Sequence, residues 1–343
     1  MSKRILAGFA VIALLAIVGC GGGAAPTPII IEKEVIKEVI KEVVVEKEWP
    51  RRPIEFVILA GTGGGADRYA RFITGINLKK KYIDQAILPV NRTGGAGAVA
   101  MDYVFKQKGN GHVVMITLNS FITTPLRQDL PFDFRDFTPI ALLALDNFPL
   151  WVHKDSPWKT WEDFITEAKE RSILVGGTGA KQEDEIVFRS IEQLTGAKPF
   201  KYVPYKGGGA VAKSLVAKDS EATVNQVSEA GPFYPEEVRP LIVFQDERLK
   251  VEGLENVPTA KELGIDFSYN MMRGIFAPPD ISEEARKGLV ELFTKINEDP
   301  EWKEFSSKAG LDNVFLTGDE LTSFLEEYEV LHKEIMKEAG WIE

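Results

Sequence analysis

The residues best suited to bind a ligand are those of segment 61–67, Gly-Thr-Gly-Gly-Gly-Ala-Asp. They follow an apolar run at 54–59, which predicts a buried strand, and precede a segment in which Tyr69, Phe72 and Ile73 share one helical face. A strand, a glycine turn and a helix together bind anions, because glycine lets the backbone approach a ligand closely and the first helical N–H groups lack partners within the helix. The turn also fits the loose GxGxxG/A pattern of dinucleotide-binding loops. It therefore predicts an anion site and leaves the kind of anion open.

A second turn of this kind, Gly-Gly-Thr-Gly-Ala-Lys, occupies 176–181, about 110 residues further along the chain. It lies between a predicted strand at 173–175 and a predicted helix at 182–194. Two such turns fit a ligand cleft between two lobes. The acidic residues Glu183, Asp184 and Glu185 fall in the first turn of that helix. Carboxylates there offset the helix dipole, so we do not expect these three side chains to bind a cation.

Predicted strands and helices alternate along the chain, with further strands at 86–90 and 113–118. Such alternation predicts an α/β fold built on parallel, doubly wound sheets. Ligands of these sheets bind beyond the carboxyl ends of the strands. Segments 61–67, 91–97 and 119–123 all follow strands, so we expect them to converge on one cleft. Within the last segment, Ser120 is a candidate hydrogen-bond donor to a ligand.

Several charged residues near these turns admit two roles. Asp67 either binds an amino group or a bridging water of the ligand, or accepts hydrogen bonds from N–H groups at the start of its helix. Arg273 either holds a second carboxylate of the ligand in a bidentate contact or forms an ion pair at a strand end. Lys181 either contacts the ligand or stays solvated. For Arg71 we expect a structural ion pair.

Signatures of catalysis are scarce. None of the three histidines, His112, His153 and His332, has the spacing of a metal ligand, and HExxH, CxxC and GxSxG are missing. A dinucleotide site needs an acidic residue at the end of the second strand, where this chain has Asn91-Arg92. The formal net charge is −10 without a basic stripe, which argues against nucleic acid as a partner. We expect no enzyme activity, no cofactor and no metal.

The N-terminus resembles a bacterial lipoprotein signal peptide. Lys3 and Arg4 precede an apolar run at 5–18, which is too short to span a bilayer comfortably. The run ends in Ala-Ile-Val-Gly-Cys, which resembles a lipobox whose cysteine, Cys20, is lipidated. Cys20 is the only cysteine in the chain. We assign 1–20 to the signal peptide and 21–50 to a low-complexity tether, which is either a solvated spacer, a marginal helix or a self-associating helix.

Six segments, in order, resemble the substrate-binding proteins of tripartite tricarboxylate transporters, known as the TctC or Bug family. The resemblance runs from about residue 52 to residue 339, nearly the whole mature chain. The segments are VILAGTGGGADRYAR, PVNRTGGAGAVAMDYV, LPFDFRDFTPIALLA, YVPYKGGGAVAKSLVA, NVPTAKELG and RGIFAPPDIS.

The resemblance implies a two-lobed, periplasmic-binding-protein-like (type II) α/β fold that closes around a small carboxylate. Lobe 1 would comprise 51–148 and 275–343, and lobe 2 would comprise 149–274. Family members hold the carboxylate with both glycine loops, through N–H groups and bridging waters. Carried onto this chain, that site comprises Thr62, Gly63, Gly64, Gly65 and Asp67 in lobe 1 and Gly177, Thr178, Gly179 and Lys181 in lobe 2.

This chain departs from the family pattern at three places. It has Ala-Lys-Gln-Glu at 180–183 where many members have Ser or Thr, Asn225-Gln226 where many have Asp-Asn, and Met272-Arg273 where an aromatic residue is common. These positions face the far end of the ligand in such folds. We keep Gln226 and Arg273 as candidate ligand contacts, but the identity of the ligand does not carry over.

The resulting hypothesis is an extracytoplasmic receptor, anchored by lipid to the outer face of the cytoplasmic membrane, that delivers a small organic carboxylate to a membrane permease. Arg273 and Lys181 favour a di- or tricarboxylate, whereas the acidic run 183–185 equally suits an amino acid. One alternative is a sensory receptor for a membrane kinase. Another is a secreted carboxylate hydrolase or lyase that uses Asp67 and Glu183 as an acid/base pair.

Overall fold

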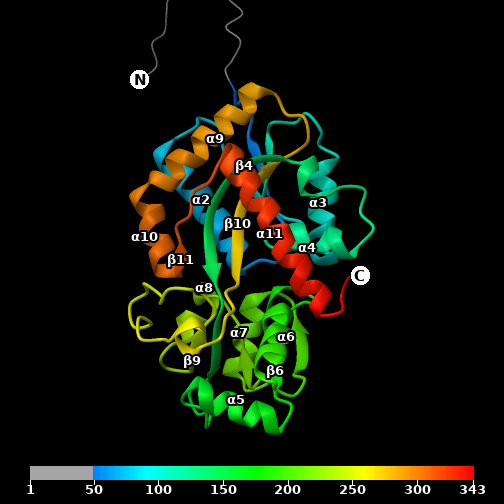
Figure 1. The fold of residues 1–343 in the computed structure, drawn as a ribbon. Helices are drawn as coiled ribbons and strands as arrows, with labels where there is room; N and C mark the ends of the chain where they lie inside the picture. Colours follow the sequence, from blue (N-terminus) through cyan, green and yellow to red (C-terminus); the bar gives the residue numbers. More distant parts are fainter. Residues whose placement is uncertain (1–48) are drawn as a thin grey trace, which may run out of the picture. The chain divides into compact units, whose positions relative to one another are not determined.

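Two β-sheets, each covered by helices, organise the chain (Figure 1). The computed structural model describes residues 49–343. The six-stranded sheet has the order β11-β4-β10-β3-β1-β2, and the five-stranded sheet has the order β7-β6-β8-β5-β9. This arrangement confirms the predicted two-lobed α/β fold. The predicted signal peptide, the lipidation site Cys20 and nearly all of the tether lie outside the described residues.

The first sheet and its helices are formed by two separate stretches of chain. The elements of the first stretch are β1 (Ile54–Ile58), α2 (Gly65–Lys80), β2 (Ile87–Asn91), α3 (Ala98–Phe105), β3 (Val113–Thr117), α4 (Ser120–Arg127) and β4 (Thr138–Asn147). The elements of the second stretch are β10 (Asn270–Ala277), α9 (Glu283–Glu298), α10 (Pro300–Ala309), β11 (Leu311–Asp312) and α11 (Gly318–Glu338).

The second sheet is formed by the stretch between them. Its elements are β5 (Pro149–His153), α5 (Trp161–Glu170), β6 (Leu174–Thr178), α6 (Glu183–Thr195), β7 (Lys201–Tyr205), α7 (Gly208–Val216), β8 (Ala222–Thr223), α8 (Val227–Ala230) and β9 (Val238–Val243). Short 3₁₀ turns at Gly95–Gly97, Phe134–Asp136, Gly231–Phe233 and Lys261–Leu263 complete the two lobes.

Both sheets are mixed, although the alternation of elements predicts parallel sheets. Strands β1, β2 and β3 are parallel to one another, and so are β6, β7 and β8. However, β10 runs antiparallel to both β3 and β4, and β5 runs antiparallel to β8 and β9. Strand β10 runs antiparallel to β4 because the chain crosses between the lobes twice and must reverse its direction when it returns; the short strand β11 is also antiparallel to β4.

The two crossings lie side by side. Only Phe148 separates β4 from β5, and β10 pairs with β4 from its first residue, Asn270, which lies opposite Asn147. The predicted boundary at 274/275 therefore falls inside β10. We propose instead that lobe 1 comprises 49–148 and 270–343 and that lobe 2 comprises 149–269. The last helix, α11, contacts α4 and β4 in lobe 1 and α6 in lobe 2 (Figure 1).

Helix α5 shows how local sequence specifies an element of lobe 2. Thr160 caps it, because its hydroxyl accepts the N–H of Asp163 while the Asp163 carboxylate accepts the N–H of Thr160. The residues that share its apolar face by helical spacing are all buried, namely Trp161, Phe164, Ile165 and Ala168.

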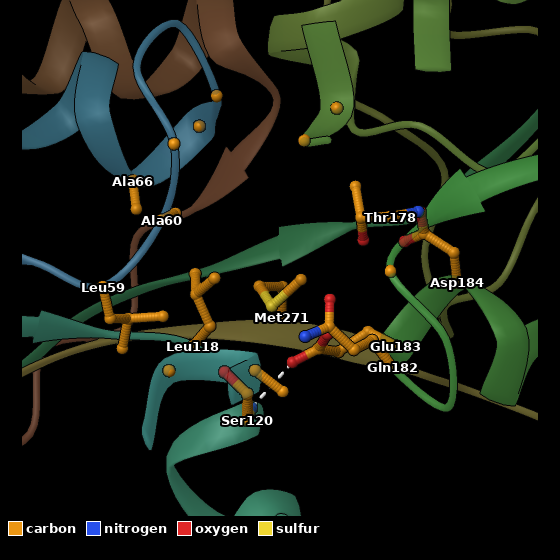
Figure 2. Close-up of a pocket in the computed structure, with 18 of the residues that line it drawn as sticks. Leu59, Ala60, Ala66, Leu118, Ser120, Thr178, Gln182, Glu183, Asp184 and Met271 are labelled. Atoms are coloured by element: carbon orange, nitrogen blue, oxygen red, sulfur yellow. Dashed lines mark hydrogen bonds between the residues drawn. The ribbon is translucent and has the colours of Figure 1, made fainter. Parts of the chain in front are cut away.

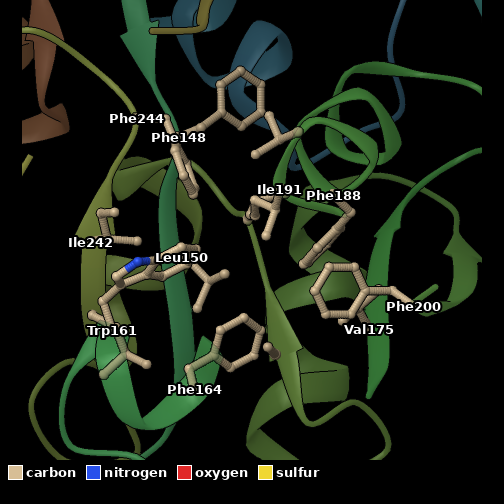
Figure 3. Close-up of a cluster of buried hydrophobic side chains, with 14 of the residues drawn as sticks. Phe148, Leu150, Trp161, Phe164, Val175, Phe188, Ile191, Phe200, Ile242 and Phe244 are labelled. Carbon is tan, nitrogen blue, oxygen red and sulfur yellow. The ribbon is translucent and has the colours of Figure 1, made fainter. Parts of the chain in front are cut away.

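The aromatic core of lobe 2 forms around this helix (Figure 3). The ring of Phe164 packs edge-on against Trp158, with centroids 5.2 Å apart, and is stacked on Phe200 at 6.0 Å. The cluster combines side chains of α5, α6 and the segment that leads into β7, so it holds these elements together. Lobe 2 carries half of the cavity described below.

Replacing Phe164 with alanine should lower the free energy of unfolding by about 3–5 kcal/mol, because the substitution leaves a cavity among close-packed rings. The matched control is Leu194→Ala in the same lobe, where the side chain is 53 % exposed and the expected change is below about 0.5 kcal/mol. Chemical denaturation followed by circular dichroism measures both. Equal losses in the two variants would contradict the assigned core.

Candidate functional site

A cavity of about 510 Å³ lies between the two lobes (Figure 2). In lobe 1 the loops after β1, β2 and β3 all reach it, as the strand ends predict. In lobe 2 it is reached by the glycine turn after β6, the loop after β7 and the start of α8. Met271 and Leu118 form an apolar part of the cavity wall, between the polar groups of lobe 1 and those of lobe 2. Such a volume suits a small organic ligand.

The predicted site residues divide into two groups. Those that line the cavity are Gly64, Gly65, Ser120, Thr178, Gly179, Gln226 and Arg273. Those outside its lining are Thr62, Gly63, Asp67, Gly177 and Lys181. The ligand contacts of the first group remain predictions, whereas the structure gives several members of the second group other roles.

Asp67 shapes the first glycine loop rather than the cavity wall. Its Oδ2 accepts the N–H of Gly63 at 2.9 Å, and its Oδ1 accepts Arg71 Nε at 2.9 Å and Asn91 Nδ2 at 3.0 Å. Partial burial alone would raise the pKa of Asp67, but the hydrogen bonds from Arg71, Gly63 and Asn91 together hold that pKa below its ordinary value. Of the two predicted roles, the structural one therefore applies, and Arg71 forms the expected ion pair.

Gly177 and Lys181 support the second loop from outside the cavity. A Cβ on Gly177 would lie 2.3 Å from Tyr202 Oη, so glycine is needed there for close packing. Lys181 adopts a positive φ of 54° with an exposed side chain, and its N–H donates to Glu185 Oε2 at 2.6 Å. The loop geometry thus depends on its backbone, while the lysine ammonium lies outside the lining.

Arg273 reaches the cavity but is already paired. Its Nε and Nη2 both donate to Oδ2 of Asp146, a neighbour on β4, and the two side chains are 2 % and 0 % exposed. Tyr69 donates its hydroxyl to the same oxygen at 2.7 Å, and the guanidinium lies 4.8 Å from the centroid of the Tyr69 ring. The predicted ion pair of Arg273 is therefore present, and its contact with a ligand remains a prediction because the residue also lines the cavity.

Three buried carboxyl groups line the cavity from the lobe 2 side: Glu183, Asp184 and Glu229. Glu183 Oε1 accepts the N–H of Ser120 at 2.7 Å, across the gap between α6 and α4 (Figure 2). Asp184 Oδ2 accepts the N–H of Thr178 at 2.5 Å. Burial raises the pKa of all three groups, and most strongly that of Asp184.

Glu229 connects the two lobes. Its Oε1 accepts the N–H of Gly65, at the start of α2, at 3.2 Å, and its Oε2 accepts Asn225 Nδ2 at 3.0 Å. A Cβ on Gly208, the first residue of α7, would lie only 1.9 Å from Glu229 Oε2. Nothing in the local sequence around α8 indicates that Glu229 faces the other lobe.

Two of the least exposed polar residues of the cavity lining have side chains without a hydrogen-bond partner among the described residues. The hydroxyl of Ser120 and the amide of Gln226 belong to residues that are only 2 % and 5 % exposed. Both residues line the cavity, and no atom of residues 49–343 bonds to either group. Neither group is among the fully buried atoms that lack a partner, so both are accessible from the cavity and are candidates to bond to a ligand there.

Other site types find no support in the part of the chain that the structure describes. Within it, no group of three or more His, Cys, Asp or Glu side chains is arranged to hold a metal ion. No helix between residues 49 and 343 combines the length and apolar character needed to cross a bilayer.

The model of the tripartite tricarboxylate transporter family receptor (TctC) matches residues 71–341. The chain belongs to this family. A curated TctC relative from Cupriavidus necator, the UPF0065 protein in the gbd 5′ region, is 23 % identical over 296 residues, covering 85 % of this chain and 89 % of the relative.

Solved structures agree with the fold of this TctC protein. A TctC solute-binding protein from Polaromonas, solved without ligand, is 26 % identical with a TM-score of 0.65, over 84 % of this chain and 99 % of that one. An R. palustris protein solved with adipate is 23 % identical with a TM-score of 0.79, over 85 % and 99 % of the two chains.

Removing the guanidinium of Arg273 should destabilise the protein strongly, because Asp146 would remain buried without its partner. For Arg273→Met we expect a loss of about 3–5 kcal/mol in the free energy of unfolding. The control is Arg248→Met, which breaks a pair with Glu262 in which both side chains are more than 40 % exposed. That variant should lose less than about 1 kcal/mol. Similar losses by urea denaturation would argue against a structural role for the buried pair.

The raised pKa of Asp184 gives its carboxyl a defined effect on stability. In the native state the Asp184 carboxyl keeps its proton to higher pH than it does in the unfolded chain. The free energy of unfolding therefore falls as the pH rises above the ordinary pKa of 3.8. The free energy of unfolding of Asp184→Asn, relative to that of the unmodified protein, should therefore increase as the pH is raised from 5 to 8. Burial lowers the pKa of His332 to about 4 and makes stability fall below pH 6.5, but this effect is common to both proteins.

The measurement is the difference in free energy of unfolding between the two proteins across that pH range. Asp219→Asn, which removes an exposed carboxylate of the same lobe, serves as the matched control. A flat difference for Asp184→Asn would show that the Asp184 carboxyl is not held in a desolvated environment.

Proposed function

We propose that this TctC protein is an extracytoplasmic receptor that captures a small organic carboxylate and presents it to the permease of a secondary transporter. The observation that carries the proposal is the pair of unpartnered side chains, Ser120 and Gln226, in a cavity between two lobes. Family membership supports a receptor role, and adipate in the R. palustris relative supports a carboxylate ligand. Receptors need no nucleophile, which agrees with the scarcity of catalytic motifs.

The carboxylate of the ligand would lie at the lobe 1 wall, bridged to lobe 2. The hydroxyl of Ser120 and the amide of Gln226 would donate to its oxygens, one from each lobe. Ala66, in the first turn of α2, also lines the cavity, and the N–H groups of a first turn have no partner within their helix. The backbones of Gly64, Gly65, Thr178 and Gly179 would close around the ligand as the lobes rotate about the paired crossings.

The charge argument for a di- or tricarboxylate becomes weaker. It depended on the cations Arg273 and Lys181 as partners for a second acidic group, but Arg273 is paired with Asp146 and Lys181 lies outside the lining. Adipate, bound in the R. palustris relative, is itself a dicarboxylate and still supports this ligand class. The proposal therefore requires one carboxylate and keeps a di- or tricarboxylate as the favoured ligand.

Anchoring and partnership complete the proposal. Lipidation at Cys20 would tether the receptor to the outer face of the cytoplasmic membrane, within reach of the permease subunits. Family membership supports the extracytoplasmic location. The alternative of a sensory receptor uses the same cavity and differs only in the partner. Co-purification of the receptor with permease subunits would support transport, and co-purification with a kinase would support sensing.

The hydrolase or lyase alternative finds no supporting geometry. Asp67 is absent from the cavity lining, and its carboxylate is held by three donors of its own loop. Glu183 is therefore left without the second member of the acid/base pair. Turnover of a bound carboxylate by purified protein would reinstate this alternative.

Ser120→Ala and Gln226→Ala should each weaken carboxylate binding roughly tenfold or more, because each removes a hydrogen bond to a charged group. Neither should lower the melting temperature of the free protein appreciably, since neither side chain has a partner there. A thermal-shift screen over mono-, di- and tricarboxylates and amino acids identifies the ligand, because a ligand raises the melting temperature by mass action.

Isothermal titration calorimetry then measures the affinity of each variant for that ligand. Gln193→Ala, which changes an exposed glutamine of α6 outside the cavity lining, is the control and should bind as the unmodified protein does. Unchanged affinity in both Ser120→Ala and Gln226→Ala would place the ligand elsewhere.

A further inference from the structure

Arg127, the last residue of α4, carries a guanidinium without a partner. Its Nε and Nη2 atoms are buried, and neither bonds to any atom of residues 49–343. Arg273, by contrast, is buried against the carboxylate of Asp146. Covering a charged group without a compensating partner costs free energy. The free receptor therefore holds Arg127 in an unfavourable state, and its partner must come from elsewhere.

The unpartnered groups of α4 lie on one helical face. Ser120, Thr123 and Arg127 are three and four residues apart and so share that face. The Thr123 hydroxyl is also buried without a partner. Where the face begins, the N–H of Ser120 donates to Glu183 Oε1 at 2.7 Å, from lobe 1 to lobe 2 (Figure 2). The row of unsatisfied donors therefore starts beside a carboxylate of the other lobe.

Arg127 is directed toward this boundary. Side chains of an α-helix lean toward its N-terminus, so the Arg127 side chain leans back along α4 toward Ser120. The seven-residue step between them is a rise of about 10 Å, of which a long arginine side chain covers a large part. Burial lowers the pKa of Arg127, whereas the negative charges of Glu183 and Glu185 act to raise it. Both acids belong to α6, in lobe 2.

Glu183 is the acid with free acceptor capacity. Beyond its own backbone, the one hydrogen bond that it receives from residues 49–343 comes from Ser120, whereas an ionised carboxylate offers about four lone pairs. Glu185 already accepts the N–H of Lys181 and lies 3.6 Å from Arg189 of its own helix. Burial raises the pKa of Glu183, so a cation beside it would stabilise its charged form.

We propose that Arg127 holds the lobes closed over a captured solute, by forming an ion pair with Glu183 across the lobe boundary when the cleft closes. This inference rests on the proposed function, because it assumes a carboxylate over which the lobes close. The approach of α6 to α4 brings the two charges together in a buried, charge-assisted contact. Because the contact forms after the ligand has entered, it slows the escape of the ligand rather than its entry.

A double-mutant cycle of Arg127→Met, Glu183→Gln and the double variant tests the ion pair. The probe is whichever of acetate, succinate, adipate, citrate and glutamate binds most tightly by calorimetry, and surface plasmon resonance measures its association and dissociation rates. Arg127→Met should raise the dissociation rate roughly tenfold and leave the association rate within about twofold. With Glu183→Gln already present, the same substitution should change the dissociation rate by less than about twofold.

The melting temperature of the free protein separates this role from a structural one. Arg127 has no partner among the described residues, so Arg127→Met should keep or raise the melting temperature while it speeds dissociation. An arginine that served only the fold would lower the melting temperature instead. Arg189→Met is the matched control, because its ion pairs with Glu185 and Glu192 lie within α6. It should leave the dissociation rate unchanged.

The outcomes distinguish this inference from the proposed function. An equal effect of Arg127→Met with and without the Glu183 carboxylate would overturn the ion pair and leave a carboxylate receptor. A lower melting temperature with an unchanged dissociation rate would assign Arg127 to the fold of the free protein and likewise overturn the inference. Failure of every acid to bind would overturn the proposed function and the inference with it.

Discussion

The buried ion pair between Arg273 and Asp146 fixes the geometry on which the cavity depends. Both residues lie on the neighbouring strands β10 and β4, just where these strands leave lobe 1. Tyr69 of α2 bonds to the same carboxylate, and a Cβ on Gly65 would lie only 2.7 Å from Arg273 Nη2. The pair thus holds the start of α2 against the lobe junction. A buried pair adds little net stability, but either partner alone would be a costly unpaired charge, so the arrangement is strongly specified.

The same pair explains how an acid from lobe 2 can lie at the start of α2. The positive charge of the nearby Arg273 acts to lower the pKa of Glu229. Burial and the negative charge of Asp146 act in the opposite direction. Acids and arginine therefore form one coupled group that spans both lobes. Its members are Asp146 and Arg273 from the crossing strands and Glu229 from α8. Changing the charge of any one changes the field felt by the others, and hence the field inside the cavity.

The sequence predicted the parts of this molecule that depend on local patterns. The apolar face of α5, the two glycine turns and the convergence of three strand ends all follow from periodicity and strand order. The position of β10 could not be predicted in this way, because its partner β4 lies more than a hundred residues away and no local signal gives the direction of β10. For Asp67 and Arg273 the sequence left two roles open, since capping, ion pairing and ligand binding use the same chemistry. For Glu183 and Asp184 it indicated the helix start but not the cavity they face, and for Glu229 it gave no signal at all.

Helix α11 makes a third connection between the lobes besides the two crossing strands. Its first half packs into a lobe 1 core through Leu321 and Leu325, whereas Ile335 belongs to the aromatic core of lobe 2. In between, the Tyr328 hydroxyl bonds to Asn119 and to the carbonyl of Asn270, where β10 begins. The helix therefore acts as a strut in parallel with the strands. Any separation of the lobes must bend it or withdraw one of its ends, so its stiffness limits how widely the cleft opens and how fast a captured solute escapes.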